Sequence, residues 1–348
     1  MRSRKLGKRA VRSESSLVTR DSSPAAADWR PVASLQTLRL RARLLQEIRQ
    51  YFRRTGALEV ETPLLVSTPV SDLHIDSFAI ASHAADEHPG FLHTSPEYHM
   101  KRLLASGIGD IYQICKVFRV GESGRLHNPE FTLVEWYRLA TDHLGLLDDV
   151  DALLRRLFSG RIELEVPSRM SYRDAFRNRT GLDPFAADTQ ELRNCAATFN
   201  AEPEGSGDLA RADWLDLVFA AAVASGFSTD RLTYIYDYPV ELAALARIRL
   251  DPAPAAERFE VFLGNVELGN GFHELTDVSE QRDRFERDRT ARRERRRPTG
   301  HIDELFLDAL HAGLPDCSGV ALGLDRVLLL AGGTIDVAHT LAFPTARA

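Results

Sequence analysis

Residues 118–138 read FRVGESGRLHNPEFTLVEWYR, and this stretch decides the fold. Its end, EFTLVEWYR at 130–138, is rich in β-branched and aromatic residues, as is the segment IYQICKVFR at 111–119. Both segments are typical of strands. The residues between them are rich in Gly, Ser, Asn and Pro, which continue neither strand. The sequence therefore predicts an antiparallel hairpin with a long loop.

The flanking segments alternate between helix and strand patterns. Apolar residues recur at helical spacing from Leu35 to Phe52, Gly56 follows, and ALEVETPLL at 57–65 indicates a strand that ends at Pro63. Further helices are expected at 143–158 and 208–225. Strands are expected at 232–239 and, as a pair, within 260–275. A last strand begins at 318 and passes into a helix that ends near 333. We therefore predict an α+β fold, an antiparallel sheet flanked by helices.

Composition limits the class of protein. The 348 residues carry a formal net charge of −6, so no global positive field attracts nucleic acid. The three cysteines, Cys115, Cys195 and Cys317, form no paired spacing, which favours a reducing compartment. Residues 1–30 are basic, Ser-rich and poor in apolar residues, and no apolar run is long enough for a membrane span. We expect a disordered basic tail at 1–30, one catalytic domain at 31–348 and a cytoplasmic protein without a membrane partner.

The common phosphate-binding loops are missing. No lysine stands in a Gly-Lys-Ser/Thr context, and GIGDIY at 107–112 lacks the third glycine of a dinucleotide-binding turn. A protein with this sequence that uses ATP must bind it with another architecture.

Three segments resemble the signature motifs of class II aminoacyl-tRNA synthetases. They are the helix and strand that end in ETPLL, the hairpin around 118–138, and GVALGLDR at 319–326. HNPEFT, TSPEYHMKR and ELGNGFHEL resemble the lysyl subgroup in particular. The resemblance implies a ligase that activates a lysine-like amino acid with ATP and Mg²⁺, and a homodimer that forms through residues 40–70.

The lysyl enzymes carry an N-terminal anticodon-binding barrel, and no such domain fits before the first motif. In this respect the chain is similar to the elongation factor P β-lysine ligases. That resemblance implies (R)-β-lysine as the small-molecule substrate and a lysine of elongation factor P as the acceptor, with tRNA an unlikely partner.

The resemblance also implies an ATP site. Adenylate formation builds negative charge on phosphate oxygens, which planar guanidinium groups bind well. Arg119 and Arg326 match the two catalytic arginines of the family. The remaining positions that match its ATP contacts are Glu122, His127, Asn128, Phe131, Glu267, Leu268 and Gly323, and the carboxylates that match its Mg²⁺ ligands are Glu260 and Glu267.

A lysine-like substrate presents two ammonium groups, so its pocket requires several carboxylates. By resemblance, Glu97 binds the backbone-side amine, and Tyr137 and Glu274 bind the side-chain ammonium. The full set expected around the amino acid is Ser95, Glu97, Glu135, Tyr137, Asn270, Phe272, Glu274 and Ala321.

Two positions separate this chain from the lysyl enzymes. Ala321 stands where those enzymes have glycine, and its methyl group favours an amine displaced one carbon along, as in β-lysine. Gly121 stands where the family has an acidic residue, and Glu122 follows one place later. Either Glu122 replaces that carboxylate or ATP binds more weakly.

Three alternatives remain open at this stage. One is a truncated synthetase that charges tRNA or another acceptor with lysine, and another is an inactive paralogue that binds an amino acid. The third is a metal site at His83, His88 and His93, whose surroundings indicate a loop.

Overall fold

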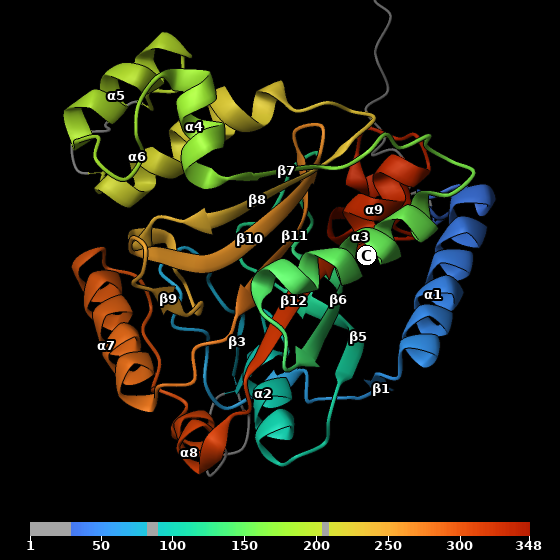
Figure 1. Cartoon of the computed structure of the whole chain (residues 1–348). Coiled ribbons are helices and arrows are strands. Elements are labelled where there is room, and N and C mark those ends of the chain that lie inside the picture. The colour runs from blue at the N-terminus through green and yellow to red at the C-terminus, as the bar shows by residue number, and fades with distance from the viewer. Residues whose placement is uncertain (1–28, 82–89, 204–208) are drawn as a thin grey trace, which may run out of the picture. The chain divides into compact units, whose positions relative to one another are not determined.

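The computed structural model describes residues 29–81, 90–203 and 209–348 (Figure 1). Nearly all of the expected tail, residues 1–28, lies outside the described residues, as do His83 and His88. Residues Val32–Ala348 form one compact unit. Among the described helices, none combines the length and the apolar character needed to cross a bilayer.

A nine-stranded sheet forms the centre of the described part of this unit (Figure 1). The strands follow the order β1 (Leu58–Glu59), β5 (Ile111–Phe118), β6 (Glu130–Leu139), β12 (Cys317–Gly323), β11 (Val266–His273), β10 (Ala255–Leu263), β8 (Leu232–Tyr238) and β7 (Ser168–Ser171), and β9 (Ile248–Arg249) pairs with β10. The pairs from β5 to β8 are all antiparallel, whereas β1 and β7 add in parallel at the edges. This sheet, flanked by helices, confirms the predicted α+β class.

The predicted hairpin is present as β5 and β6, with Gln113 opposite Glu135. The strand expected to run from Ala57 to Pro63 is wrong in extent, because β1 covers only Leu58–Glu59. Pro63 has no N–H to donate to a neighbouring strand, so the ladder stops before it. The chain resumes as β2 (Leu65–Val66), which pairs with β4 (Gly90–Leu92) beside β3 (Ala79–Ile80) in a separate small sheet.

Three helices cover one face of the large sheet. They are α1 (Leu35–Thr55), α3 (His143–Phe158) and α9 (Leu324–Ala331). The Ser34 hydroxyl accepts the Thr37 N–H at the start of α1, and Gly56 ends it with a φ of 83°. Leu44, Ile48 and Phe52 of this helix are fully buried. They belong to one apolar core with Trp136 and Val320 of the sheet and with side chains of α3 and α9.

The opposite face is covered at its two ends. At one end α2 (Glu97–Ala105), α7 (Val278–Glu294) and α8 (Glu304–Gly313) pack Met100, Phe285 and Phe306 against Ile111 and Tyr137. At the other end α4 (Tyr172–Thr180), α5 (Thr189–Thr198) and α6 (Arg211–Val218) form a further core with β8 and β10. The helix expected at 208–225 ends earlier, and the chain continues through a π turn and a 3-10 turn.

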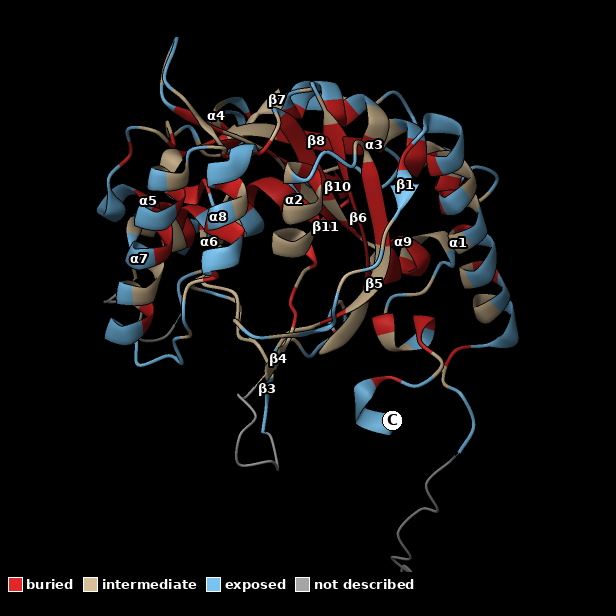
Figure 2. Cartoon of the chain, turned by 90° about the horizontal axis from the view of Figure 1, so that it is seen from below, coloured by how far each residue is buried: buried red, intermediate tan, exposed pale blue. Residues whose placement is uncertain are grey.

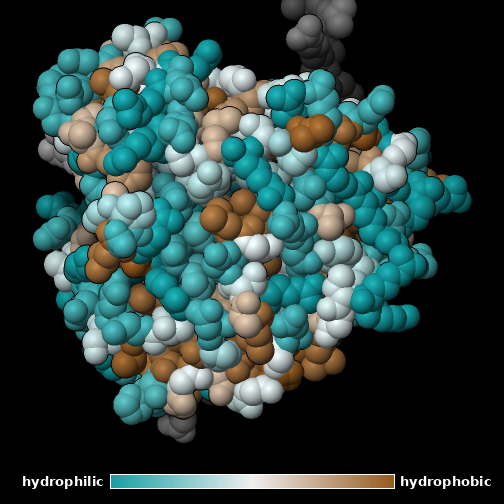
Figure 3. Space-filling view, viewed as in Figure 1, coloured by the Kyte–Doolittle hydropathy of each residue, from teal (hydrophilic) through white to brown (hydrophobic). Residues whose placement is uncertain are grey.

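Buried residues follow the central strands, as Figure 2 shows in red between the helices. The surface seen in Figure 3 is mainly hydrophilic, with hydrophobic residues gathered in small groups. The apolar side chains are therefore used in the cores, and the middle of the second sheet face is left for polar residues.

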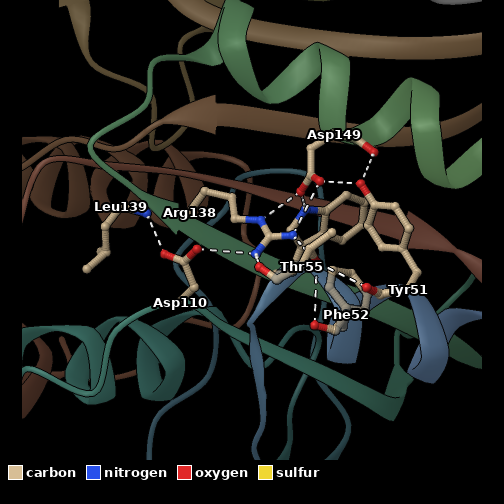
Figure 4. Close-up of polar contacts among 8 residues, drawn as sticks. Tyr51, Phe52, Thr55, Asp110, Arg138, Leu139 and Asp149 are labelled. Atoms are coloured by element: carbon tan, nitrogen blue, oxygen red, sulfur yellow. Dashed lines mark hydrogen bonds and ion pairs between the residues drawn. The ribbon is translucent and has the colours of Figure 1, made fainter.

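A polar cluster joins α1, α3 and the β5–β6 hairpin on the helix-covered side (Figure 4). The Arg138 guanidinium donates to Asp149 at 2.8 Å and to the Thr55 hydroxyl at 2.7 Å. Asp149 also accepts from the Trp136 indole N–H at 2.9 Å and from the Tyr51 hydroxyl. One carboxylate thus fixes the end of α1 to the sheet.

Asp149→Ala should lower the free energy of unfolding by about 2–4 kcal/mol, because it leaves Arg138 and two further buried donors without their acceptor. The measurement is urea denaturation followed by circular dichroism. Asp148→Ala is the matched control on the same helix. The Asp148 side chain is 75% exposed and pairs only at the surface with Arg169, so this change should cost less than about 1 kcal/mol. Equal losses in the two variants would contradict the structural role of Asp149.

Candidate active site

The register of the sheet gathers the expected amino-acid residues on one face. Residues directly opposite in neighbouring strands point to the same side. One row across the sheet consists of Gln113, Glu135, Ala321, Asn270 and Glu260, and the next consists of Ile111, Tyr137, Gly319, Phe272 and Arg258. The residues between these rows point into the core under α1 and α3. The strands therefore bring Glu135, Asn270 and Glu260 together on the open face.

A β-bulge adjusts this pattern near the start of β11. Val261 lies opposite Gly269, but Phe262 lies opposite Glu267, so Leu268 is the extra residue. The Leu268 side chain is 1% exposed and packs in the core, which leaves only its backbone for the nucleotide contact expected there. Because of the bulge, Glu267 and Asn270 share the open face despite their odd spacing.

Three of the expected amino-acid residues, Ser95, Glu135 and Tyr137, form direct hydrogen bonds. The Glu135 carboxylate accepts from the Ser95 hydroxyl at 2.7 Å and from the Tyr137 hydroxyl at 2.8 Å. Gly319 lies under Tyr137 and Glu274. A Cβ at that position would be 2.3 Å from the Tyr137 ring and 2.6 Å from Glu274 Oε1, so only glycine permits this approach.

Lys101, which was not among the expected site residues, lies within this acidic cluster. Its side chain is 1% exposed, and Nζ is 2.6 Å from Glu97 Oε1 and forms a second ion pair with Glu274. The i, i+4 spacing from Glu97 in TSPEYHMKR could have indicated the first pair. The second joins residues far apart in the sequence. Among the described residues, one lysine against Glu97, Glu135 and Glu274 leaves two carboxyl groups without a cationic partner.

Burial changes the proton affinity of these groups. Burial raises the pKa of Glu135 to about 7, with the charge of Glu97 adding to the effect and the Ser95 and Tyr137 hydrogen bonds opposing it. Burial raises the pKa of Glu274 to about 8, although Lys101 opposes this. Glu274 Oε1 is buried and has no hydrogen-bond partner in the described part of the chain. The pocket therefore contains carboxyl groups that hold protons near neutral pH until a cation replaces them.

The expected ATP residues form a second cluster along the same face. The Arg119 guanidinium lies 5.0 Å from the centre of the Phe131 ring and is 3.2 Å from Glu122. Gly121 has a φ of 81°, and this turn brings Glu122 back towards Arg119. The displaced Glu122 therefore lies next to the hairpin arginine.

Arg326 lies on the other side of this cluster. It donates to the backbone carbonyl of Glu267 at 2.9 Å and lies 2.8 Å from His127 Nε2. Burial and the charge of Arg326 lower the pKa of His127, with Glu122 and Glu267 opposing and Arg119 adding. In the neutral imidazole, His127 Nε2 can accept a hydrogen bond from the Arg326 guanidinium. The charges of Arg119 and Arg326 both disfavour protonation of His127.

Glu260 and Glu267 lie close enough for the charge of one to affect the other. Burial raises the pKa of Glu260 to about 7, with Arg258 opposing and Glu267 adding. Arg258 lies 2.5 Å from Glu260 and also donates to Asn270 at 3.1 Å. The two carboxylates supply the hard oxygen ligands that Mg²⁺ requires, but Arg258 competes for Glu260.

Asn128 has a structural role that the sequence did not suggest. Its amide nitrogen donates to the Glu130 carbonyl at 2.5 Å and to the Thr345 hydroxyl at 3.0 Å, and its oxygen accepts the Thr345 N–H at 3.1 Å. The amide is thus used within the chain, which argues against the expected side-chain contact with a nucleotide. Of the histidines considered for a metal site, the described one, His93, is buried, with Nε2 2.6 Å from the Lys116 carbonyl.

Two comparisons identify known proteins that are similar to this chain. The family described as tRNA synthetases class II (D, K and N) matches residues 23–347. Curated relatives named elongation factor P–(R)-beta-lysine ligase include proteins of Salmonella dublin, Salmonella paratyphi B and Salmonella enteritidis. Each is 43% identical over 325 residues, which covers 92% of this chain and 99% of the relative.

The raised pKa values of Glu135 and Glu274 predict a pH dependence. A diamino acid binds to the ionised carboxylates, so its affinity should rise between pH 6 and pH 8, by up to about tenfold per unit for each proton released. Calorimetry with lysine or β-lysine in buffers of different ionisation enthalpy measures this release.

The stability of the protein without ligand should change with pH in the opposite direction. Because both pKa values lie above the ordinary 4.5, the free energy of unfolding should fall as pH rises from about 5 to 8. Binding without proton release at pH 7 would contradict this assignment.

Proposed function

This chain belongs to the class II tRNA synthetase family, and we propose that it activates (R)-β-lysine with ATP and transfers it to a lysine of elongation factor P. The family match and the relatives confirm the resemblance to the β-lysine ligases and a ligase activity. The observation that carries the proposed substrate is the buried acidic pocket. Two of its carboxyl groups have no cationic partner among the residues that the structure describes, and a diamino acid brings two ammonium groups.

The reaction has two steps. In the first, a carboxylate oxygen of the amino acid attacks the α-phosphorus of ATP, which forms a mixed anhydride with AMP and releases pyrophosphate. In the second, the deprotonated ε-amine of the acceptor lysine attacks the carbonyl carbon of the anhydride, forms an amide and releases AMP. Both steps depend on positioning and on charge stabilisation at the phosphate.

We assign the orientation of the amino acid to the acidic pocket. Glu97, at the start of α2, binds the backbone-side amine, and Glu274 and Tyr137 bind the side-chain ammonium. The unpartnered Glu274 Oε1 supports this role, because it is a buried acceptor that a cation would satisfy. Asn270 and Phe272 lie in the rows beside these groups and form the wall of the pocket.

We assign the nucleotide to the cluster around His127. In the free protein, Arg119 and Arg326 contact Glu122 and Glu267, whose side chains are 27% and 40% exposed. Partly exposed ion pairs are weak, so the guanidinium groups can exchange these partners for phosphate oxygens. Phe131 offers its ring to the adenine once Arg119 moves from it. Glu267 and Glu260 would hold Mg²⁺, which would neutralise phosphate charge.

Further parts of the proposal rest on the family alone. An acceptor that takes part in translation places the reaction in the cytoplasm. The family also suggests a homodimer that forms through residues 40–70. Exposed Leu58, Leu64 and Leu65 in this region are compatible with such an interface.

The proposal is tested by intact-mass measurement of elongation factor P after incubation with this protein, ATP, Mg²⁺ and (R)-β-lysine. We expect a gain of one β-lysyl group that requires all components. Glu274→Gln should reduce this gain at least about 100-fold, because it removes a buried charge partner of the substrate. Glu163→Gln is the control, because Glu163 is exposed and lies outside the sequence motifs. This change should leave the gain of the β-lysyl group unchanged. Transfer of the amino acid to tRNA in place of elongation factor P would favour the truncated synthetase. The absence of any amino-acid activation would favour an inactive paralogue.

Ala321 provides a separate test of substrate choice. It lies between Glu135 and Asn270 in the row across the sheet, so its methyl group points into the pocket. Ala321→Gly should raise the kcat/KM for α-lysine by roughly 10- to 100-fold, since a methyl group in such a pocket is worth about 1–3 kcal/mol. ATP–pyrophosphate exchange measures this, with (R)-β-lysine as the reference substrate. An unchanged rate with α-lysine would show that Ala321 does not discriminate.

A further inference from the structure

A group of metal-ligating side chains lies behind the acidic pocket, on the helix-covered side of the sheet. His143 is the first residue of α3, Glu257 lies in β10 and His273 ends β11. Each offers a ligand atom within 4.8 Å of the others. Arg258 and Phe272 point to the open face. Glu257 directly precedes Arg258 and His273 directly follows Phe272, so alternation places Glu257 and His273 on the opposite face. The group is thus separate from the substrate site.

The three side chains are almost completely enclosed. His143 and His273 are 2% and 7% exposed, and the Glu257 side chain is 14% exposed. Enclosed ionisable groups at this density require mutual hydrogen bonds or a bound cation. A solvated surface cluster would have no such requirement.

Two outer carboxylates orient the histidines. His143 Nε2 is 3.0 Å from Asp237, and His273 Nε2 is 3.0 Å from Asp316. Arginines hold both carboxylates in place, since Arg249 and Arg247 each approach their aspartate to 2.7 Å. A carboxylate on one ring nitrogen keeps the proton there and leaves the other nitrogen as a lone pair. This is the arrangement that supports histidine ligands of metal ions.

The Nδ1 atoms of His143 and His273 accept no hydrogen bond from an N–H or O–H group of the described residues. His143 Nδ1 is buried and has no hydrogen-bond partner among the described residues. His273 Nδ1 lies 2.6 Å from Glu257 Oε2. With the ring proton on Nε2, His273 Nδ1 is an acceptor beside Glu257 Oε2, and a bound cation would satisfy both atoms. With the proton on Nδ1, His273 donates to Glu257 instead.

We propose that His143, Glu257 and His273 bind a divalent transition-metal ion of the zinc class. Two imidazoles and one carboxylate suit such an ion, with water in the remaining position. The ion joins the start of α3 to β10 and β11, and His273 directly precedes Glu274 of the acidic pocket. Its role is therefore structural, as a link that holds the sheet beneath the substrate site. The competing arrangement is a protonated His273 between Glu257 and Asp316, with no ion.

The test uses the full chain without a histidine tag, stripped with a chelator and then dialysed against micromolar Zn²⁺ in excess Mg²⁺, so that carboxylates of the ATP site are occupied. We expect one Zn²⁺ per chain by elemental analysis, and a Co²⁺ derivative with visible absorption typical of nitrogen and oxygen ligands. His143→Ala should weaken Zn²⁺ binding by more than about tenfold, since loss of an outer partner alone costs that much. Glu257→Gln is a second ligand variant, and circular dichroism establishes that each variant is folded.

His311→Ala is the control, because His311 is exposed on α8 and belongs to no such group among the described residues. This variant should retain the full Zn²⁺ content. The proposal is overturned if the unmodified protein retains no Zn²⁺, or if folded His143→Ala and Glu257→Gln both bind it as well as the His311→Ala control. Neither outcome bears on the ligase activity, which is measured separately.

Discussion

The ion pairs of Lys101 are the constraint on which the site depends. Three carboxylates cannot stay buried on one sheet face without compensation, because each loses its hydration and repels the others. Burial alone would lower the pKa of Lys101, but Glu274 and Glu97 raise it above its ordinary value, so the lysine stays charged. It holds α2 against the sheet and leaves the pocket short of cations. The pocket is thus prepared for a substrate that carries them.

The sheet allows this pocket to exist beside a stable core. Strict alternation along β6 sends Trp136 into the apolar core and Glu135 and Tyr137 to the open face. The same alternation along β12 puts Val320 in the core and Gly319 under the pocket. Stability and binding therefore use different faces of the same strands. The polar cluster around Asp149 supports this division by attaching α1 to the back of the hairpin.

The two ends of the proposed reaction differ in how firmly the protein holds its groups. The amino-acid end is buried and rigidly paired, with Glu274 fully enclosed. At the nucleotide end, Arg119 and Arg326 form ion pairs with the partly exposed Glu122 and Glu267. Arg326 also contacts His127. A site that must admit a large charged nucleotide and release pyrophosphate benefits from partners that exchange easily. The acidic pocket, which selects a small substrate, benefits from preorganisation.

The sequence by itself determined the elements whose signals are local. Periodicity predicted α1, strand propensity and turn residues predicted the β5–β6 hairpin, and the motifs that resemble class II synthetases identified Glu97, Glu135, Tyr137 and Glu274 as neighbours. Tertiary structure alone decided which distant charges meet. The pairing of Lys101 with Glu274, the use of Asn128 by Thr345 and the approach of His143 to His273 each join residues far apart in the chain. Charge compensation and hydrogen bonding act through space, so residue spacing does not encode them.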